Sequence, residues 1–345
     1  MREPIFLRPT GKDYLWGGSR INDEFGKGIA LEPLAETWEC STHPDGPCYA
    51  VGGQFDALSL TDILKAHPEF LGTHPDSGGD LPILIKFIDA KKDLSVQVHP
   101  TDEYAAVHEK GQRGKTEMWY VLDAAKGAKL VYGLSRDVTP EVLRRSIENG
   151  TVETYLQTIP VAKNDVFFIE AGTIHAIGAG ALIAEIQESS NLTYRLYDYD
   201  RVDKDGKKRP LHIEKALAAA NLRSSAEPAQ PMRVLRYQPG CARELLCRCR
   251  YFEVSRMLVN TERRQKVTFR ADPVSFRVLL CVYGFWGIAI VQTLTFFPVC
   301  YMMLKGLLKN IDPSLEEAAR DMGASRWKVF TSVTFPLLLP VERTT

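Results

Sequence analysis

Three polar side chains stand in runs that otherwise read as buried β-strands. Gln97 and His99 belong to the run LSVQVHP, and Glu117 opens the next such run, EMWYVLD. Residues i and i+2 of a strand point to the same face, so Gln97 and His99 project together while the two flanking valines can pack into a core. If the two strands are neighbours, Glu117 meets this pair.

A fourth polar residue, His175, follows a glycine turn at the end of a strand in KNDVFFIEAGTIHAIGAG. Two imidazoles, one carboxylate and one amide oxygen suit zinc, manganese or iron as ligands. Ligands drawn from separate strands leave a coordination position open for water or substrate. A single histidine near a strand is more often a hydrogen-bonded structural residue, so the metal-site prediction rests on the four residues together. The other histidines lack such company: His43, His67, His74, His108 and His212. We expect surface positions for His67 and His74, which flank a helix.

The elements that must position these residues are mainly short strands. Most of the first 240 residues read as strand-like runs separated by turns, including LPILIKFIDA, AKLVYGL and ALIAEIQE, which is the rhythm of an all-β sandwich or barrel. The stretch between His99 and Lys115 reads as a polar loop. Helix signals occur only in SLTDILKAHPEFLG, TPEVLRRSIENG and HIEKALAAANLR, which we interpret as small helical decorations. Residues 226–240, rich in proline, read as a connector to four more strand-like runs.

Composition excludes some classes of function. The chain has 345 residues, 45% apolar and 25% charged, which is ordinary globular composition. Its 43 basic residues balance its 43 acidic ones, so no positive field favours nucleic acid. The first residues lack the apolar core of a secretory signal, and the seven cysteines contain no C-x-x-C pair. We therefore expect a cytoplasmic protein without a disulfide framework.

Spaced motifs over residues 1–284 resemble type I mannose-6-phosphate isomerases, the zinc enzymes of the cupin superfamily. The motifs are Trp16-Gly17-Gly18, ETWECSTHPDGP, SVQVHPTDEYA, GKTEMWYVL, EAGTIHAIGAG and ESSNLTYRLYDYDR. The resemblance implies a cupin jelly roll, also called a double-stranded β-helix, whereas the residues alone predict only many short strands.

The resemblance also implies roles for individual residues. One divalent ion per chain, zinc, would be bound by Gln97, His99, Glu117 and His175. Lys115 corresponds to a lysine of substrate handling and catalysis, Glu185 to an acidic active-site residue, and Arg195 to an arginine important for substrate and catalysis. Ser95 is a candidate for contact with the substrate phosphate.

These residue types suit the reaction that the family performs. Interconverting mannose 6-phosphate and fructose 6-phosphate moves a proton between C1 and C2 through a cis-enediol, so a base is needed and negative charge develops on oxygen. Zinc can stabilise that oxygen, and a cation such as Lys115 or Arg195 can clamp the phosphate or the enediolate.

Two positions depart from the family pattern. Asn164 stands where glycine is common, and asparagine tolerates the left-handed conformation that such a turn requires. Glu170 stands where relatives usually carry proline. An additional carboxylate near the site would change metal affinity or the pH optimum.

The end of the chain departs more strongly. Residues 278–304 contain no charged residue, whereas a membrane-spanning helix needs about 20 apolar residues. From 285 onward the chain resembles inner-membrane permease subunits of binding-protein-dependent ABC transporters, through Glu317-Ala318-Ala319, Gly323 and Val333-x-Phe335-Pro336. A permease needs several spanning helices, so we expect a fusion or assembly junction without an ATPase partner. Membrane contact through 278–304 remains an open alternative.

The predicted organisation is therefore a catalytic cupin domain over 1–240, an incomplete second β-domain over 241–284 and a helical, permease-like tail over 285–345. Three other functions stay open. Two histidines and one carboxylate also form the iron triad of oxygenases. A metal-free sugar-binding cupin would keep sugar binding after His99→Ala, and a membrane-transport component would associate with an ATPase.

Overall fold

The computed structural model describes residues 4–73, 80–202, 205–226, 228, 230, 233–259 and 277–280. Residues 1–280 form one compact unit, to which this description is confined. The predicted tail over 285–345, nearly all of the apolar segment 278–304 and the strand-like run at 265–271 lie outside the described residues. Among the described residues, no helix has both the length and the apolar character needed to cross a membrane.

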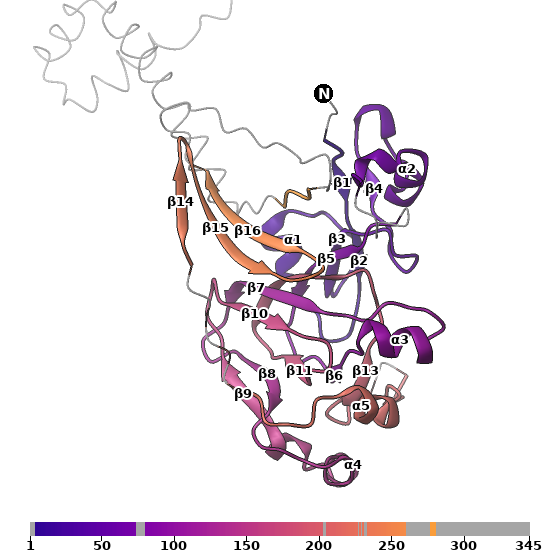
Figure 1. Cartoon of the computed structure of the whole chain (residues 1–345), viewed down its shortest axis with the longest axis vertical. Helices are drawn as coiled ribbons and strands as arrows, with labels where there is room; N and C mark the ends of the chain where they lie inside the picture. The colour runs from indigo at the N-terminus through magenta and orange to yellow at the C-terminus, as the bar shows by residue number, and fades with distance from the viewer. Residues whose placement is uncertain are drawn as a thin grey trace, which may run out of the picture. The chain divides into compact units, whose positions relative to one another are not determined.

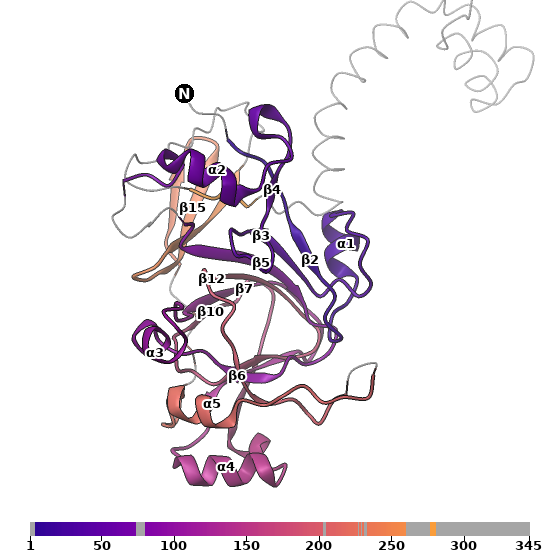
Figure 2. The same cartoon turned by 90° about the vertical axis from the view of Figure 1, so that its right-hand side faces the viewer.

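Two antiparallel sheets face each other and enclose the interior of this unit (Figures 1 and 2). The six-stranded sheet has the order β10 (Val166–Ile169), β7 (Glu117–Ala124), β12 (Ala181–Glu188), β5 (Ile83–Asp89), β3 (Glu36–Cys40) and β2 (Thr10–Lys12). The five-stranded sheet has the order β13 (Tyr194–Tyr197), β6 (Val96–Val98), β11 (His175–Ile177), β8 (Lys129–Leu134) and β9 (Leu156–Pro160). The prediction of a mainly β protein is confirmed.

Two smaller sheets accompany them. One pairs β1 (Leu7–Arg8) with β4 (Tyr49–Ala50), and the other joins β14 (Leu235–Gln238), β15 (Cys241–Arg248) and β16 (Glu253–Val259). β14 lies within the stretch predicted as a connector, and its hairpin with β15 turns at residues 239–240. The predicted boundary at 240 therefore falls inside the β14–β15 hairpin. Strand β14 begins soon after Pro231, the second of the three prolines in this stretch.

In the part of the chain that the structure describes, five short α-helices decorate the sheets, and three of them match the predicted helix signals. These three are α2 (Leu60–Ala66), α4 (Pro140–Glu148) and α5 (Ile213–Ala219), to which α1 (Arg20–Phe25) and α3 (Asp102–His108) are added. Short 3-10 turns lie at Gly53–Phe55, Pro68–Phe70 and Val152–Tyr155. The prediction of a polar loop after His99 is wrong at α3, where the Thr101 hydroxyl accepts a hydrogen bond from Tyr104 N as an N-terminal cap.

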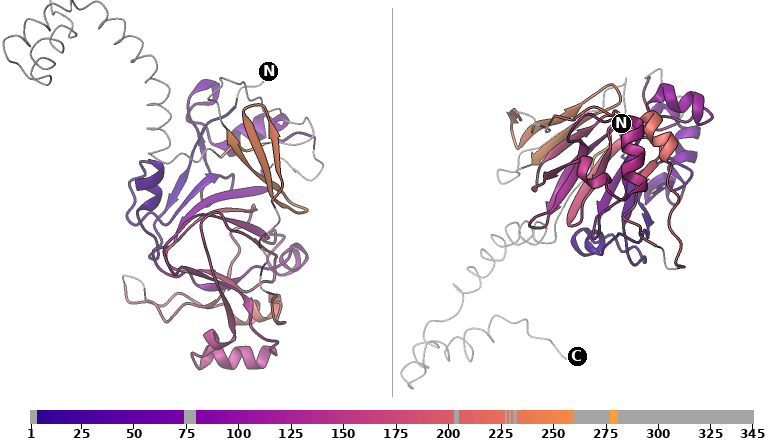
Figure 3. Two further views of the ribbon diagram at one scale, coloured as in Figure 1. Left: turned by 90° about the vertical axis from the view of Figure 1, so that its left-hand side faces the viewer. Right: turned by 90° about the horizontal axis from the view of Figure 1, so that it is seen from below.

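The central strands β12, β5 and β3 of the six-stranded sheet are buried on both faces, and β12 shows how the faces differ. Leu182, Ala184 and Ile186 pack outward in a core that includes Leu246 of β15, so the β14–β16 sheet covers this face (Figure 3). Ala181 and Ile183 point inward, into a second core. Because every second residue of a strand points to the same face, Glu185 and Gln187 also point inward. The interior is therefore apolar at one end and polar at the other.

Candidate metal centre

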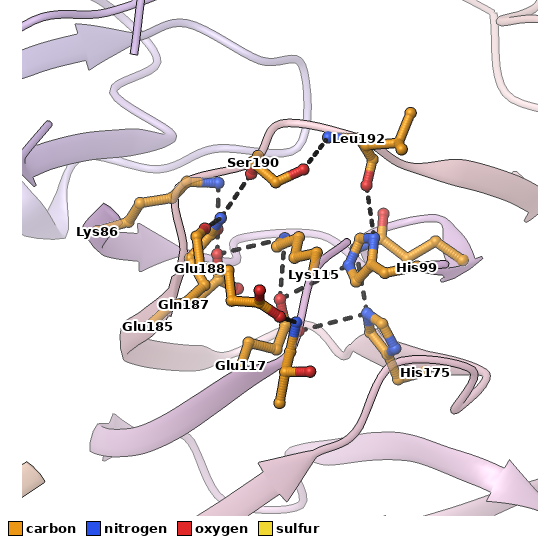
Figure 4. A network of polar contacts seen from close by, with 12 residues as sticks. Lys86, His99, Lys115, Glu117, His175, Glu185, Gln187, Glu188, Ser190 and Leu192 are labelled. Atoms are coloured by element: carbon orange, nitrogen blue, oxygen red, sulfur yellow. Dashed lines mark hydrogen bonds and ion pairs between the residues drawn. The ribbon is translucent and has the colours of Figure 1, made fainter. Parts of the chain in front are cut away.

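Strand register brings the predicted ligands together from both sheets. Gln97 on β6 has two direct cross-strand partners, His175 on β11 and Arg195 on β13. Glu117 comes from β7 of the opposite sheet. Its carboxylate oxygens lie 3.6 Å from His99 Nε2 and 3.4 Å from His175 Nε2 (Figure 4). The amide Nε2 of Gln97 is 3.4 Å from the same atom of His175.

These spacings fit a single ion. Ligand atoms about 2.0–2.1 Å from a tetrahedral zinc ion lie roughly 3.3 Å from each other. The ligand atoms of His99, Glu117 and His175 all lie within 4.8 Å of one another, and the three side chains are buried. His99 Nε2 and Glu117 Oε1 have no hydrogen-bond partner among the described residues, although buried polar atoms normally have one. A cation between them would satisfy both.

The backbone fixes how the two imidazoles face this point. His99 Nδ1 lies 2.8 Å from the carbonyl oxygen of Leu192, and His175 Nδ1 lies 2.8 Å from that of Thr173. A carbonyl can only accept, so each Nδ1 carries the hydrogen and each Nε2 keeps its lone pair toward Glu117. This is the tautomer that a metal-binding histidine needs.

Electrostatics agree with this arrangement. Burial, helped by the Lys115 ammonium, holds the pKa of His99 well below its usual range, and burial lowers the pKa of His175 to about 4. Both imidazoles are therefore neutral near pH 7, as ligation requires. Burial and the neighbouring Glu185 raise the pKa of Glu117 to about 7, so this carboxylate needs a nearby cation to stay ionised. The donor set fits a divalent ion such as zinc.

A row of alternating charges extends from Glu117 across the six-stranded sheet (Figure 4). Lys115 Nζ lies 2.9 Å from a Glu117 oxygen and 3.6 Å from Glu185 Oε1. Lys86 Nζ lies 3.3 Å from the same Glu185 oxygen and 3.7 Å from Glu36 Oε2. All five side chains are buried, so each charge depends on its neighbours rather than on water.

Two tryptophans hold the carboxylates of this row in place. Trp119 Nε1 donates to Glu185 Oε2 over 3.0 Å, and Trp38 Nε1 donates to Glu36 Oε2 over 2.8 Å. Burial alone would raise the pKa of Glu185, but Lys115 and Lys86 lower it to about 2. Although burial opposes the charge on Lys86, Glu36 and Glu185 raise its pKa. Glu185 and Lys86 therefore form an ionised pair at the centre of the row.

Lys86 and Glu36 were not predicted as site residues. A signal existed, because Lys86 is the one charge inside the run ILIKFI, whose residues are all buried. The same reasoning that singled out Gln97 applies to it: a polar residue in a buried strand needs a partner.

The remaining predicted site residues are Arg195 and Ser95. Arg195 is half-buried, its Nη1 donates to Pro210 O over 2.9 Å, and its buried Nε has no hydrogen-bond partner in the described part of the chain. Burial and the neighbouring Arg209 lower the pKa of Arg195. Ser95 is buried immediately before β6. The contact of Ser95 with a substrate phosphate stays a prediction.

The two departures from the family pattern have different outcomes. Asn164 has a φ of +74°, so the expectation of a left-handed turn there is confirmed. Glu170 is exposed and follows Ile169, the partner of Glu117 on β10. Burial and, to a smaller extent, the charge of Glu170 raise the pKa of Tyr132 on β8. Tyr132 is the cross-strand partner of His175 on β11. Glu170 therefore stays outside the buried row, and its effect on metal affinity stays a prediction.

A cavity of about 740 Å³ lies beside the site, and no sequence pattern indicated it. It lies between the segment after β3, helix α2 and the turn after β12, and its lining includes His43, Lys65, Arg113, Ser189 and Ser190. The four predicted metal ligands are not among its lining residues. Ser190 connects the two regions, because its carbonyl accepts a hydrogen bond from Gln187 of the inner face.

Comparison with known proteins gives relatives for the described part of the chain. The family model for the catalytic domain of type I phosphomannose isomerase matches residues 5–128. The probable mannose-6-phosphate isomerase GmuF of Bacillus subtilis is 43% identical over 217 residues, covering 63% of this chain and 68% of that protein. The mannose-6-phosphate isomerase ManA of the same organism is 40% identical over 225 residues, covering 65% and 70%.

Solved structures agree with these relatives. The crystal structure of the mannose 6-phosphate isomerase from Bacillus subtilis aligns with a TM-score of 0.70 at 35% identity, over 75% of this chain and 81% of that chain. A putative mannosephosphate isomerase from Archaeoglobus fulgidus aligns with a TM-score of 0.56 at 25% identity, over 71% and 78%.

The end of the chain matches a different family. The model for the inner membrane component of binding-protein-dependent transport systems matches residues 274–342. The ferric transport system permease FbpB of Actinobacillus pleuropneumoniae is 51% identical over 59 residues, which is 17% of this chain but 9% of that protein. The resemblance of the tail to permease subunits is confirmed, and it extends over a small part of such a subunit.

Proposed function

Because the chain belongs to the type I mannose-6-phosphate isomerases, we propose that it interconverts mannose 6-phosphate and fructose 6-phosphate at the cluster of His99, Glu117 and His175. The observation that carries this proposal is the orientation of the two imidazoles, each held by a backbone carbonyl so that its free nitrogen faces one buried carboxylate. Gln97 presents its amide Nε2 to His175, and with the amide turned so that its oxygen faces the ion, these residues would bind one zinc ion per chain.

The reaction passes through a cis-enediol, so negative charge collects on the oxygens of C1 and C2. A divalent ion at this centre supplies Lewis-acid stabilisation of that oxygen. The ammonium groups of Lys115 and Lys86 add to it, because they lie in a buried region where a charge acts more strongly than in water. Glu185 contacts both ammonium groups and Glu36 contacts that of Lys86, which holds the two groups in place.

A proton must also move between C1 and C2. In the buried row, the groups that can exchange a proton without being metal ligands are Lys86, Lys115, Glu185 and Glu36. Lys115 is the one that lies next to a ligand, Glu117, and we assign it the closest contact with the reacting carbons. With a pKa of about 2, Glu185 is a weak base, so its proposed catalytic role is to position Lys115.

Arg195 is the proposed partner of the substrate phosphate or of the enediolate. Its neighbours Arg201 and Arg209 are both paired with Asp198, whereas the Nε of Arg195 is buried and makes no hydrogen bond within the described residues. A guanidinium with a free donor suits an anionic oxygen. Ser95 is the second proposed phosphate contact.

We further propose that the two facing sheets form a cupin jelly roll and that the β14–β16 sheet is part of an incomplete second β-domain reaching to about residue 284. Residues 285–345 would take no part in the isomerase reaction. A cytoplasmic location follows from the chemistry proposed, because sugar phosphates are intracellular metabolites.

The test is a coupled isomerase assay on the purified full chain before and after chelation. We expect isomerisation of mannose 6-phosphate that disappears on chelation and returns on adding zinc. Activity that survives complete metal removal would overturn the proposal. An iron content with substrate-dependent oxygen uptake would instead favour an oxygenase, and sugar binding that is unchanged in His99→Ala would favour a metal-free binding protein.

A further inference from the structure

Gln187 enters the interior next to the metal centre, and the reaction described above does not use it. It lies on β12 two residues after Glu185, so both side chains point to the same inner face. On the neighbouring strand β7, its direct cross-strand partner is Glu117. The Gln187 side chain is completely buried. It therefore lies among the acidic residues of the site.

The amide of Gln187 is held in a single orientation (Figure 4). Its Nε2 donates to the carbonyl oxygen of Glu188 over 2.8 Å and to that of Ser190 over 2.6 Å. Both partners are acceptors, so only the nitrogen end of the amide can face them. Both amide hydrogens are thereby used, and Oε1 is turned away from the 188–190 turn.

The other end of the amide, Oε1, lacks a partner among the described residues. Gln187 Oε1 is buried and accepts no hydrogen bond from any residue that the structure describes. Its acidic neighbours Glu117 and Glu185 make no hydrogen bond to it. A buried acceptor without a donor is costly, and in a native protein it calls for a missing partner. That partner must bring a hydrogen to this point.

We propose that Gln187 Oε1 accepts a hydrogen bond from a non-reacting hydroxyl group of the bound sugar phosphate, and thereby contributes to the choice of sugar. The proposal rests on the proposed isomerase function. A rigid acceptor suits this role, because the two carbonyls prevent the amide from turning and so favour a hydroxyl in one place. A site built to bond a hydroxyl discriminates against a ligand that lacks it.

The experiment measures binding of mannose 6-phosphate and its 3-deoxy and 4-deoxy analogues, as inhibition constants with the metal-loaded full chain. Gln187→Met is the variant, because methionine has similar length and no hydrogen-bonding amide. We expect the wild type to bind one deoxy analogue at least about tenfold more weakly than mannose 6-phosphate. The variant should bind that analogue and mannose 6-phosphate with inhibition constants within about twofold of each other.

The quantity compared between the two proteins is the ratio of the inhibition constants of analogue and mannose 6-phosphate. An effect of the substitution that weakens binding of every ligand equally cancels in this ratio. Equal discrimination by the two proteins would overturn the proposal and point to a buried water or a purely structural amide. If Gln187→Met does not fold, the wild type alone decides: undiminished binding of both analogues would refute the assignment. A wild type that neither binds nor isomerises mannose 6-phosphate would instead refute the proposed function.

Discussion

The ammonium group of Lys86 lies 3.3 Å from the carboxylate of Glu185, and the two residues are direct cross-strand partners on β5 and β12. Lys86 thereby joins Glu36 to the charges around the metal centre, and its ammonium lies 5.1 Å from the centre of the Trp38 ring. The single charge within the apolar run ILIKFI was a signal for this role that the prediction of site residues did not use.

Lys86→Met should lower kcat by at least about 100-fold, because a preorganised cation near the developing enediolate is removed. It should also lower the unfolding free energy by about 3–5 kcal/mol, since Glu36 and Glu185 lose the charge between them. Steady-state kinetics and denaturant unfolding measure the two effects. The exposed Lys91 of the following turn gives a matched control, Lys91→Met. Wild-type kcat in Lys86→Met would exclude Lys86 from the reaction.

His175→Ala should reduce the bound metal from one equivalent toward zero and lower activity by about 1000-fold or more, because it removes one of the few ligands. Metal content by mass spectrometry and the isomerase assay are read on the same sample. His108, exposed at the end of α3, provides the control variant His108→Ala. Full metal content in His175→Ala would place the ion elsewhere.

Arg195→Gln should raise KM for mannose 6-phosphate about tenfold or more, because a charge-assisted contact to the substrate is lost. Arg144, which is paired with Glu214 at the surface, gives the control Arg144→Gln. An unchanged KM together with unchanged kcat would show that Arg195 only supports the backbone through Pro210.

Glu188 predicts a pH dependence of stability. Its side chain is 2% exposed, its oxygen accepts from Thr116 N, and burial raises its pKa to about 7, with Asp102 adding to the rise and Arg113 opposing it. The unfolded carboxyl ionises near 4.5. The protonated Glu188 carboxyl therefore stabilises the folded state. This stabilisation is fully present below pH 4.5 and is lost as the pH rises through 7.

In the wild type, Glu188 should accordingly lower the unfolding free energy by on the order of 2–3 kcal/mol as the pH rises from 4.5 to 8, and Glu188→Gln should lack this decrease. Denaturant unfolding across this range, with excess zinc at each pH, makes the measurement. Glu148→Gln at an exposed position is the control. Parallel pH profiles for Glu188→Gln and the wild type would show that Glu188 is not the group responsible.

The tail gives a prediction about solubility. Residues 278–304 contain no charge, and large apolar surfaces promote association. A chain of residues 1–284 should therefore be more soluble than the full chain and keep kcat within about twofold, because all proposed site residues precede residue 196. Expression of both chains side by side, with soluble yield and activity compared, tests this. Equal soluble yields would show that the tail is harmless.

The ligands could be predicted from the sequence better than their surroundings. Gln97 and His99 were accessible because an i, i+2 pair of polar residues in a strand needs only local periodicity. Convergence of Glu117 and His175 on that pair depends on the strand order of two sheets, which only the family resemblance implied. Lys86 and Gln187 were not used, although each is a polar residue in an otherwise buried run. Only the pairing of β5, β12 and β7 shows that these positions face the interior.

Some local signals were present and not used. Thr101 with two acidic residues in the first turn is a common helix start, and it produced α3 where a loop was expected. The β14 strand follows a proline-rich stretch so closely that composition alone placed it in the connector.

The carbonyl oxygens that orient His99 and His175 belong to the main chain, so they remain in place when the metal is withdrawn. A stripped protein should therefore accept a fresh ion without refolding. Since the pocket is built in advance, it should accept cobalt or manganese offered at high concentration as well as zinc, and the order of intrinsic affinities together with the metals supplied by the host would decide which one the enzyme carries.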